Sequence, residues 1–294
     1  MALSSRPARA EGCGASAAAH FFAQRGFCLV EGLLRPEQLE LLRDECDELK
    51  VGLERRGGDL SEEQCVLDVP PQGVPPEADP ARTDSAAYLQ YRAFRQERAA
   101  AGKGSSDPIA ELILQILPAA AARALGCNDY ERQQIRLFNE HYVVKPAKVG
   151  GRFDWHTDIA HQQEAAAALL SSDPVTEPLP EYISVWCPLD DVTEANGCLV
   201  LLPKDAPQPP DASPDLPASD HTRQWLEKAP ESVHLHVCAG TAVLFSSRLW
   251  HCSEANLSAG DRRVYYAQYS QGPIGGEASP LSLAVRTRAQ GHPP

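Results

Sequence analysis

Short apolar runs separated by turn-forming residues fill the chain from about residue 134 to residue 270. Runs of about five residues are typical of β-strands and are too short for buried helices. Glycine, proline and asparagine mark the turns between these runs, as at Gly150-Gly151 and Ala195-Asn196-Gly197. Many short strands in succession predict a mainly β fold whose core is a jelly roll.

The chain before residue 134 favours helices, which we expect to flank the β-core. Pro36 opens a predicted helix that continues to about residue 49, because apolar residues recur there at helical spacing. Residues 85–101 and 109–117 carry similar apolar spacing and predict two more helices. Such apolar stripes indicate helices that pack against a core.

The length of 294 residues exceeds that of a common domain, but β-barrels of this size are often single domains. We therefore expect residues 17–294 to form one domain, with its β-core at about 134–270. Residues 1–16 are rich in Ala, Ser, Arg and Gly, which predicts a disordered tail. A short organellar transit peptide is the alternative for this segment.

One short run places a histidine and a carboxylate two residues apart, at His156 and Asp158. The pattern predicts that this run is a strand, in which alternate side chains share a face and can point at one atom. A second apolar run ends downstream in His251. Two histidines and one carboxylate are the ligands of non-haem iron(II) oxygenases. The sequence therefore predicts a metal centre built from these three residues.

Three other histidines and a cysteine are further candidate ligands. His234 and His236 also share a face of a predicted strand, but no carboxylate or basic residue accompanies them, and we interpret them as solvent-facing. His161 follows Asp158 by three residues and is interpreted as a polar residue of a lid. Cys252 neighbours His251 in sequence and therefore faces the opposite way, which indicates a packed thiol.

Charge and cysteine usage limit the partners and the compartment. A net charge of -13 argues against a general nucleic-acid-binding protein, since phosphate binding requires clustered Lys and Arg. No apolar run reaches the roughly 18 residues needed to cross a bilayer. The nine cysteines are scattered singly, which fits a reducing cytoplasm. We expect a cytoplasmic protein that acts on a small molecule and has no nucleic-acid or membrane partner.

A longer pattern surrounds the three metal ligands. It comprises residues 22–34, the His-x-Asp run, the strand that carries Trp186, the turn Asn196-Gly197-Cys198-Leu199, and Leu249-Trp250-His251-Cys252-Ser253 followed by Asn256 and Arg262. In this order the pattern resembles the phytanoyl-CoA dioxygenase family, over about residues 18–270. The resemblance implies a double-stranded β-helix, another name for this jelly roll, that uses Fe(II), 2-oxoglutarate and O2. It implies hydroxylation of a C–H bond of a small organic substrate, with release of succinate and CO2.

The resemblance also assigns residues to the cosubstrate. Arg262 would hold the distal carboxylate of 2-oxoglutarate with help from Ser253, and the planar fork of arginine suits a carboxylate. Trp186 and His141 would line the same pocket. Thr157 stands in the middle of the His-x-Asp run, where the family often has Gln, and would be a shorter member of the pocket. The family's upstream cosubstrate lysine has three candidate counterparts here, which are Arg95, Arg98 and Lys103.

Two other functions are compatible with the same metal ligands. A binding or sensing protein would hold the metal and 2-oxoglutarate without turnover. Thr157 and the run Pro203-Lys204-Asp205-Ala206, where the family has Pro-Gly-Ser-His, motivate this alternative. A zinc hydrolase would use the three ligands but would have no need of Arg262. Succinate release and the effect of replacing Arg262 therefore distinguish the three functions.

Overall fold

The structure is a computed structural model that describes residues 15–55, 57–58, 60, 65–68, 108–127, 135–148, 151–169, 179–272 and 283–284. The predicted helix at 85–101 lies outside these residues, and so do the lysine candidates Arg95, Arg98 and Lys103. Within the described part of the chain, no helix is long and apolar enough to span a bilayer.

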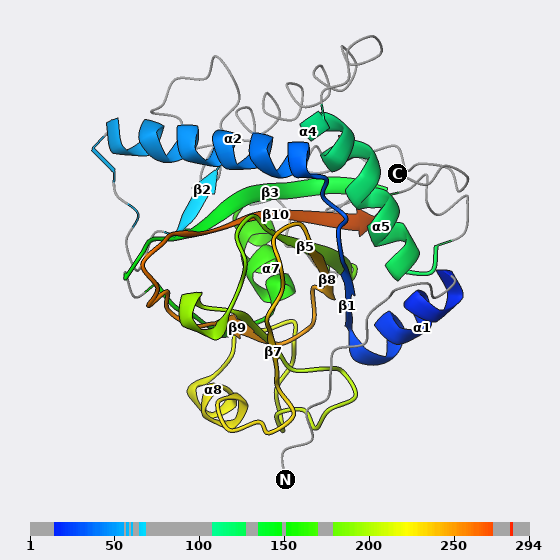
Figure 1. The fold of residues 1–294 in the computed structure, drawn as a ribbon. Coiled ribbons are helices and arrows are strands. Elements are labelled where there is room, and N and C mark those ends of the chain that lie inside the picture. The colour runs from blue at the N-terminus through cyan, green and yellow to red at the C-terminus, as the bar shows by residue number, and fades with distance from the viewer. Residues whose placement is uncertain are drawn as a thin grey trace.

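Two antiparallel sheets form the centre of the molecule, as Figure 1 shows. The larger sheet has the order β1-β8-β5-β10-β3-β11, and β2 also pairs with β3. Its strands are β1 (Phe27–Val30), β2 (Val66–Asp68), β3 (Ile135–Lys145), β5 (Tyr182–Pro188), β8 (Ala242–Ser246), β10 (Arg262–Gln271) and β11 (Leu283–Ala284). The smaller sheet has the order β4-β9-β6-β7, from β4 (Phe153–His156), β9 (His251–Ser253), β6 (Leu199–Leu201) and β7 (Val233–Leu235). The predicted mainly β jelly roll is confirmed.

Helices cover the outer face of the larger sheet, with α2 lying across it in Figure 1. The helices before the β-core are α1 (Ala15–Arg25), α2 (Pro36–Arg55), α4 (Pro108–Glu111), the π-helical turn η1 (Leu112–Ile116) and α5 (Leu117–Ala124). The β-core itself contains α7 (Asp158–Leu169), the short turn η2 (Glu194–Asn196) and α8 (Asp220–Leu226). The helices predicted from Pro36 and at 109–117 are confirmed, since apolar residues at helical spacing pack onto the sheet.

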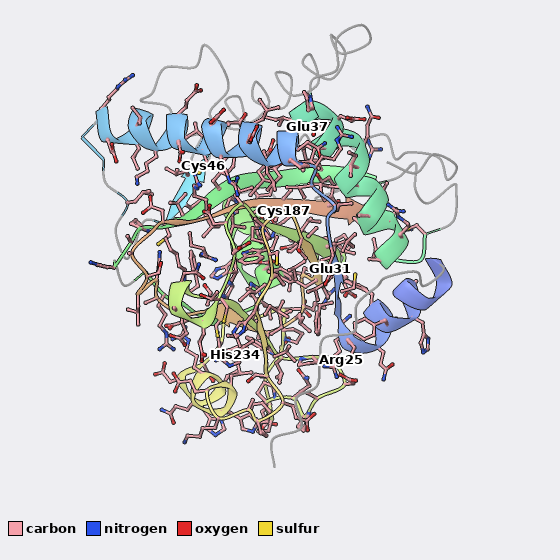
Figure 2. All side chains as sticks on the ribbon, in the orientation of Figure 1. Arg25, Glu31, Glu37, Cys46, Cys187 and His234 are labelled. Atoms are coloured by element: carbon pink, nitrogen blue, oxygen red, sulfur yellow. The ribbon has the colours of Figure 1, made fainter. Side chains whose placement is uncertain are left out.

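Strand alternation divides the apolar core into two layers. On β10, Tyr265 and Ala267 pack toward the helices, whereas Val264 and Tyr266 pack toward the smaller sheet. The helix-facing layer also contains Cys46 of α2, which lies on the α2 side of the sheet in Figure 2. The second layer lies between the two sheets and surrounds the site described below.

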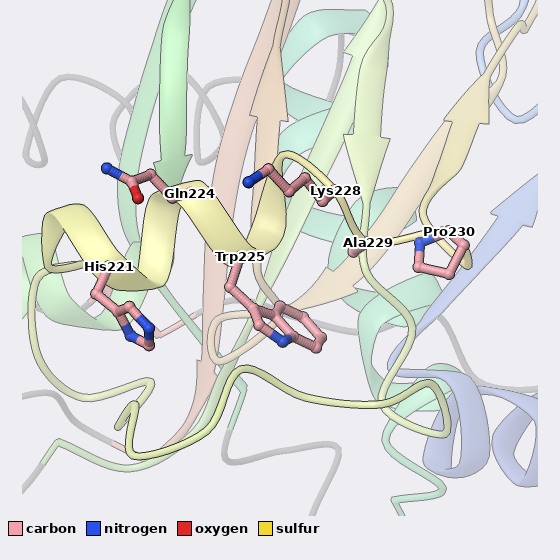
Figure 3. Close-up of a pocket in the computed structure, with 6 residues that line it drawn as sticks. All are labelled: His221, Gln224, Trp225, Lys228, Ala229 and Pro230. Atoms are coloured by element: carbon pink, nitrogen blue, oxygen red, sulfur yellow. The ribbon is translucent and has the colours of Figure 1, made fainter.

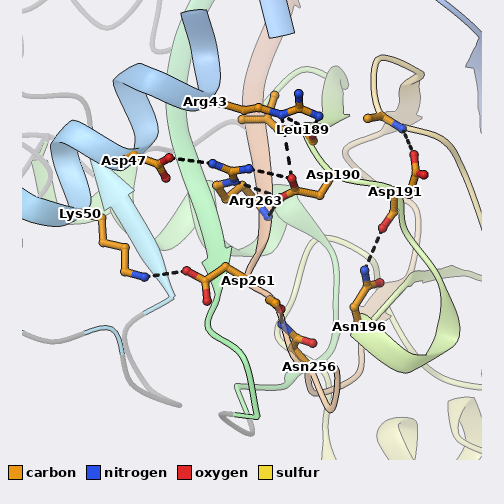
Figure 4. Close-up of polar contacts among 12 residues, drawn as sticks. Arg43, Asp47, Lys50, Leu189, Asp190, Asp191, Asn196, Asn256, Asp261 and Arg263 are labelled. Atoms are coloured by element: carbon orange, nitrogen blue, oxygen red, sulfur yellow. Dashed lines mark hydrogen bonds and ion pairs between the residues drawn. The ribbon is translucent and has the colours of Figure 1, made fainter. Parts of the chain in front are cut away.

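Ion pairs attach α2 to the beginning of β10, as Figure 4 shows. Arg263 contacts Asp190 and Asp47, each at 2.8 Å, and Lys50 contacts Asp261 at 2.6 Å. These side chains are partly exposed, so each pair stabilises the fold by at most about 1 kcal/mol. They mark the outer face of β10 at Arg263, and strand alternation places the neighbouring residue Arg262 toward the interior.

Candidate metal centre

Three side chains from three elements converge between the sheets. His156 ends β4, Asp158 begins α7 and His251 begins β9, and the two histidines are cross-strand partners. Their rings have centroids 4.1 Å apart, and His251 Nε2 lies 3.6 Å from Asp158 Oδ1. One ligand atom from each residue lies within 4.8 Å of the others. Small side-chain rotations would bring all three to the metal–ligand distances of about 2.0–2.2 Å that a first-row ion requires.

The local backbone at this site differs from the prediction. We expected His156 and Asp158 on one strand, and this is wrong, because β4 ends at His156 and Asp158 is the first residue of a helix. A carboxylate is favourable there, since the N-terminus of a helix carries a partial positive charge. Thr157, between them, is buried and its hydroxyl donates to Pro214 O at 2.5 Å. Thr157 therefore lies outside the pocket that we expected it to line.

Both histidines are oriented by backbone carbonyls. Nδ1 of His156 lies 2.6 Å from Asp154 O, and Nδ1 of His251 lies 2.9 Å from Leu249 O. A ring that donates from Nδ1 presents an unprotonated Nε2, which is the form that binds metals. Burial, and then the nearby His251, lowers the pKa of His156 to about 3. The imidazole of His156 is consequently neutral at pH 7.

The carboxylate of Asp158 is held at one of its two oxygens. Ser184 Oγ and the Tyr266 hydroxyl both donate to Oδ2, while Oδ1 faces His251. Burial acts to raise the pKa of Asp158, but the histidines and these two hydrogen bonds outweigh burial and lower it below its usual value. Asp158 therefore presents Oδ1 as an ionised ligand while Oδ2 is occupied by its own hydrogen-bond donors.

Two basic side chains lie at one end of the space between the two sheets. Arg262 and Lys145 are cross-strand partners on β10 and β3, and both are buried. Lys145 Nζ donates to Ser253 Oγ at 2.8 Å and to the Ser253 carbonyl at 3.0 Å. Burial, and then Arg262, lowers the pKa of Lys145 to about 7. Burial also lowers the pKa of Arg262 to about 10, which leaves its guanidinium charged at pH 7.

Two donor atoms of the Arg262 guanidinium lack acceptors in the described part of the chain. The side chain of Arg262 is 1% exposed, and neither Nε nor Nη2 has a hydrogen-bond partner among the described residues. Its Cζ lies 5.6 Å from the centre of the Trp186 ring, which supplies a cation–π contact but no hydrogen-bond acceptor. A buried, charged fork with unused donors is costly unless an anion binds to it. The site therefore fits a ligand that carries a carboxylate.

A cavity of about 200 Å³ joins the metal ligands to this basic end. Its lining contains His156, Asp158 and His251 together with four of the five residues expected to bind the cosubstrate, which are Arg262, Ser253, Trp186 and His141. Burial lowers the pKa of His141 to about 4, so this side chain is neutral where it stacks on Tyr266. His161 and Cys252 also line the cavity, and the ring of His161 lies 5.1 Å from that of His156.

The other candidate sites do not form metal centres. His234 and His236 are exposed, as predicted, and Figure 2 shows His234 near the smaller sheet. A separate hollow next to α8 is lined by six residues, among which His221 and Trp225 face it in Figure 3. It offers one histidine and no carboxylate. In the described part of the chain, no second group of three metal-binding side chains comes together.

Several residues of the cavity were missed from the sequence. They are Asn139 on β3, Tyr266 and Gln268 on β10, and Gln162 on α7. Lys145 and Ser184, which contact Ser253 and Asp158 beside the cavity, were missed as well. Part of the signal was present, because polar residues stand at alternate positions in β3, at Asn139 and His141, and in β10, at Tyr266 and Gln268. Interpreting it requires the register between strands that are far apart in the chain.

Comparisons with solved structures show the same fold in Fe- and 2-oxoglutarate-binding proteins. EvdO2 from Micromonospora carbonacea var. aurantiaca, complexed with 2-oxoglutarate, is 17% identical, with a TM-score of 0.52 over 93% of this chain and 97% of that chain. The carbocyclase SnoK from nogalamycin biosynthesis is 18% identical, with a TM-score of 0.56 over 97% and 91%. The epimerase SnoN, in complex with Fe3+, alpha ketoglutarate and nogalamycin RO, is 18% identical, with a TM-score of 0.54 over 94% and 96%.

Sequence comparison gives the family. No curated protein matches the chain. A sequence model of phytanoyl-CoA dioxygenase (PhyH) matches residues 22–264, which is most of the chain and includes all three metal ligands. The chain therefore belongs to the phytanoyl-CoA dioxygenase family of Fe(II)- and 2-oxoglutarate-dependent oxygenases.

Proposed function

We propose that this oxygenase hydroxylates a C–H bond of a small organic molecule, with His156, Asp158 and His251 holding Fe(II). The observation that carries the proposal is Arg262, whose buried guanidinium has unused donors in a cavity that also contains the three metal ligands. When bound, Fe(II) and 2-oxoglutarate supply an O2-dependent oxidation that converts the cosubstrate to succinate and CO2.

One polar atom of each metal ligand is already engaged by a neighbouring group. His156 and His251 present Nε2, and Asp158 presents Oδ1, because Nδ1 of each ring and Oδ2 of the carboxylate are engaged elsewhere. Ligands fixed in this way need little reorganisation when the ion binds. The chain thus supports binding through three preset donor atoms.

Arg262 holds the distal carboxylate of 2-oxoglutarate on this proposal. Its unused Nε and Nη2 belong to the edge of the guanidinium that pairs both oxygens of a carboxylate. Lys145 adds positive charge and orients Ser253, whose hydroxyl it contacts at 2.8 Å. Trp186 covers the guanidinium and excludes water from the ion pair. Burial of this pair strengthens it, because charges attract more strongly in a low dielectric.

Anaerobic titration with Fe(II) and 2-oxoglutarate tests the proposal. The chelate of 2-oxoglutarate on Fe(II) has a visible metal-to-ligand charge-transfer band, which we expect in the wild type and not in Arg262→Met at the same cosubstrate concentration. Arg263→Met is the matched control, because it removes the neighbouring arginine, whose ion pairs lie on the outer face. Loss of the band in both variants, or in neither, would contradict the role of Arg262.

Turnover separates the oxygenase from the two alternatives. We expect the wild type to release succinate in air, and a protein that binds but does not react would release almost none. A zinc hydrolase would retain its activity in Arg262→Met, because that reaction has no use for the guanidinium.

We also propose that residues 17–294 form one domain, which acts in the cytoplasm. Support for one domain comes from the larger sheet, which combines β1 near the beginning of the chain with β11 near its end. Support for a reducing compartment comes from the odd number of cysteines and from buried thiols such as Cys28 and Cys187. Fractionation of cells that express the tagged chain would test the compartment.

A further inference from the structure

We propose that Asn139, Gln162 and Gln268 form a substrate subsite for an uncharged group that bears hydroxyls, at the end of the cavity opposite Arg262. The inference rests on the proposed function, because it concerns the molecule whose C–H bond reacts at the metal centre. It adds the chemical class of that molecule.

Strand register places this carboxamide cluster far from the cosubstrate end. Arg262 pairs with Lys145 at one end of β10 and β3, and Gln268 pairs with Asn139 six residues further along. Six residues of extended strand correspond to about 20 Å. Tyr266, whose hydroxyl donates to Asp158, lies between these two ends. The inner face of β10 therefore runs from a cationic end, past the metal centre, to an uncharged polar end.

Hydrogen bonds fix the cluster. Gln268 Oε1 accepts from Asn139 Nδ2 at 3.1 Å and from Gln162 Nε2 at 3.0 Å. Gln268 Nε2 lies 3.4 Å from both Ser184 Oγ and the Tyr266 hydroxyl, which in turn hold the metal ligand. The cluster is thus connected to the metal centre by a continuous chain of hydrogen bonds. A group bound here would be held in a defined position relative to Asp158.

The orientation of Asn139 and Gln162 determines what they offer. Each uses one N–H on Gln268, so each retains a carbonyl oxygen and a second N–H, and both residues line the cavity. Carboxamides present acceptors and donors together and carry no charge. A hydroxyl group also donates and accepts, so a substrate with one or more hydroxyls complements this surface.

The charges in the cavity argue against an anionic substrate group at this end. Among the described lining residues other than histidines, the charged side chains are Asp158, which binds the metal, and Arg262, which serves the cosubstrate end. A carboxylate or phosphate placed on the carboxamides would lose its hydration without gaining a counter-charge, which is unfavourable. The apolar side chain of Phe245 lines the cavity beside the metal centre, with its ring 4.8 Å from that of His251, and suits the carbon skeleton.

Ligand-observed NMR on the protein loaded with Zn(II) and 2-oxoglutarate tests the inference, since Zn(II) keeps the complex diamagnetic. The probes are methyl glycosides and cyclic diols, each paired with its carboxylate analogue, such as methyl β-D-glucopyranoside with methyl β-D-glucuronide. We expect the neutral members to bind and the carboxylates to bind at least about tenfold more weakly. Equal or tighter binding by the carboxylates, or no binding by any neutral probe, would overturn the inference.

Glutamine variants test where the neutral probes bind. Gln268→Leu and, separately, Gln162→Leu should each weaken the neutral probes about tenfold, as expected for lost hydrogen bonds to neutral groups. Gln24→Leu is the control, because Gln24 is exposed on α1 and contacts Asp205. If Gln268→Leu does not fold, Gln162→Leu decides the outcome, since Gln162 lies on α7 and is only partly buried. Unchanged affinity in the folded variants would refute the subsite.

The same samples separate failure of this inference from failure of the proposed function. Binding of 2-oxoglutarate is measured first, in the wild type and in both glutamine variants, by its own NMR signals. If 2-oxoglutarate binds and the neutral probes do not, the subsite is wrong and the oxygenase assignment is untouched. If 2-oxoglutarate fails to bind even to the wild type, the cosubstrate role of Arg262 is wrong.

Discussion

Replacing Arg262 with methionine should make the ligand-free protein more stable while it removes cosubstrate binding. Methionine fills a similar volume without polar atoms. Two buried donors of Arg262 lack partners among the described residues, and each unsatisfied donor costs about 1–3 kcal/mol. The cation–π contact with Trp186, worth about 0.5–2 kcal/mol, is lost in exchange. At the middle of these ranges we expect a net gain of about 3 kcal/mol in the free energy of unfolding.

Adding 2-oxoglutarate should reverse the order of stability. The wild type gains two charge-assisted hydrogen bonds through Arg262, each worth about 1.5–3 kcal/mol. Their loss weakens binding in Arg262→Met by about 10²–10⁴-fold, since 1.4 kcal/mol corresponds to a factor of ten. A ligand that binds only the folded state stabilises it in proportion to ln(1 + [L]/Kd). The variant should therefore gain almost nothing at cosubstrate concentrations that stabilise the wild type.

Thermal unfolding of the Zn(II)-loaded proteins, with and without 2-oxoglutarate, measures both effects. For a chain of this size, 1 kcal/mol corresponds to roughly 2 °C in Tm. Arg263→Met is the control, since it loses partly exposed ion pairs and should unfold slightly earlier but keep the full shift with 2-oxoglutarate. The reasoning fails if Arg262→Met is less stable than the wild type without ligand, or if it retains the cosubstrate shift.

Three further variants test the surroundings of the site. Tyr266→Phe removes a donor to Asp158 and should weaken Zn(II) binding about 10–100-fold by equilibrium dialysis, with unchanged binding as the contrary result. Lys145 has a folded pKa of about 7 against an ordinary value of 10.5, so the unfolded state binds more protons between these pH values. Urea unfolding should then show that the stability of the wild type, relative to that of Lys145→Met, rises by about 2 kcal/mol from pH 7 to pH 9. No change would contradict the lowered pKa of Lys145. Gly197→Ala should lower the free energy of unfolding by at least about 2 kcal/mol, measured with urea, because φ at this position is +81° and the new Cβ would collide with the Glu254 carbonyl. An unchanged free energy of unfolding would argue against this close approach.

The metal ligands were predictable because their spacing in sequence carries chemical information. His156 and Asp158 are close in the chain, and His251 follows a recognisable apolar run, so residue type and order sufficed. The expectation that His156 and Asp158 share one strand was wrong, since Asp158 begins a helix. Its side chain still reaches the site because the chain turns at Thr157, whose hydroxyl is bonded to Pro214 instead of facing the cavity.

Residues that depend on register could not be predicted from the sequence. Lys145 reaches Ser253 across 108 residues, and Gln268 meets Asn139 across 129. The sequence around each residue does not identify its partner, because a shift of one residue between β3 and β10 would exchange the inner and outer faces of either strand. Short apolar runs predicted the strands, but the partner of each polar residue follows only from the assembled sheet.

The two adjacent arginines of β10 illustrate how the fold supports an unfavourable charge. Arg263 is held on the outer face by Asp190 and Asp47, whereas Arg262 is buried on the inner face, where its Nε and Nη2 find no acceptor among the described residues. Backbone pairing of β10 with β3 and β5 fixes the inward orientation of Arg262 in the absence of a ligand, and strand alternation places Arg263 on the outer face. The free energy of binding a carboxylate therefore includes the free energy that folding lost when it left these two donors of Arg262 without acceptors. Strong binding at this end of the cavity and low intrinsic stability of the ligand-free site follow from the same buried guanidinium.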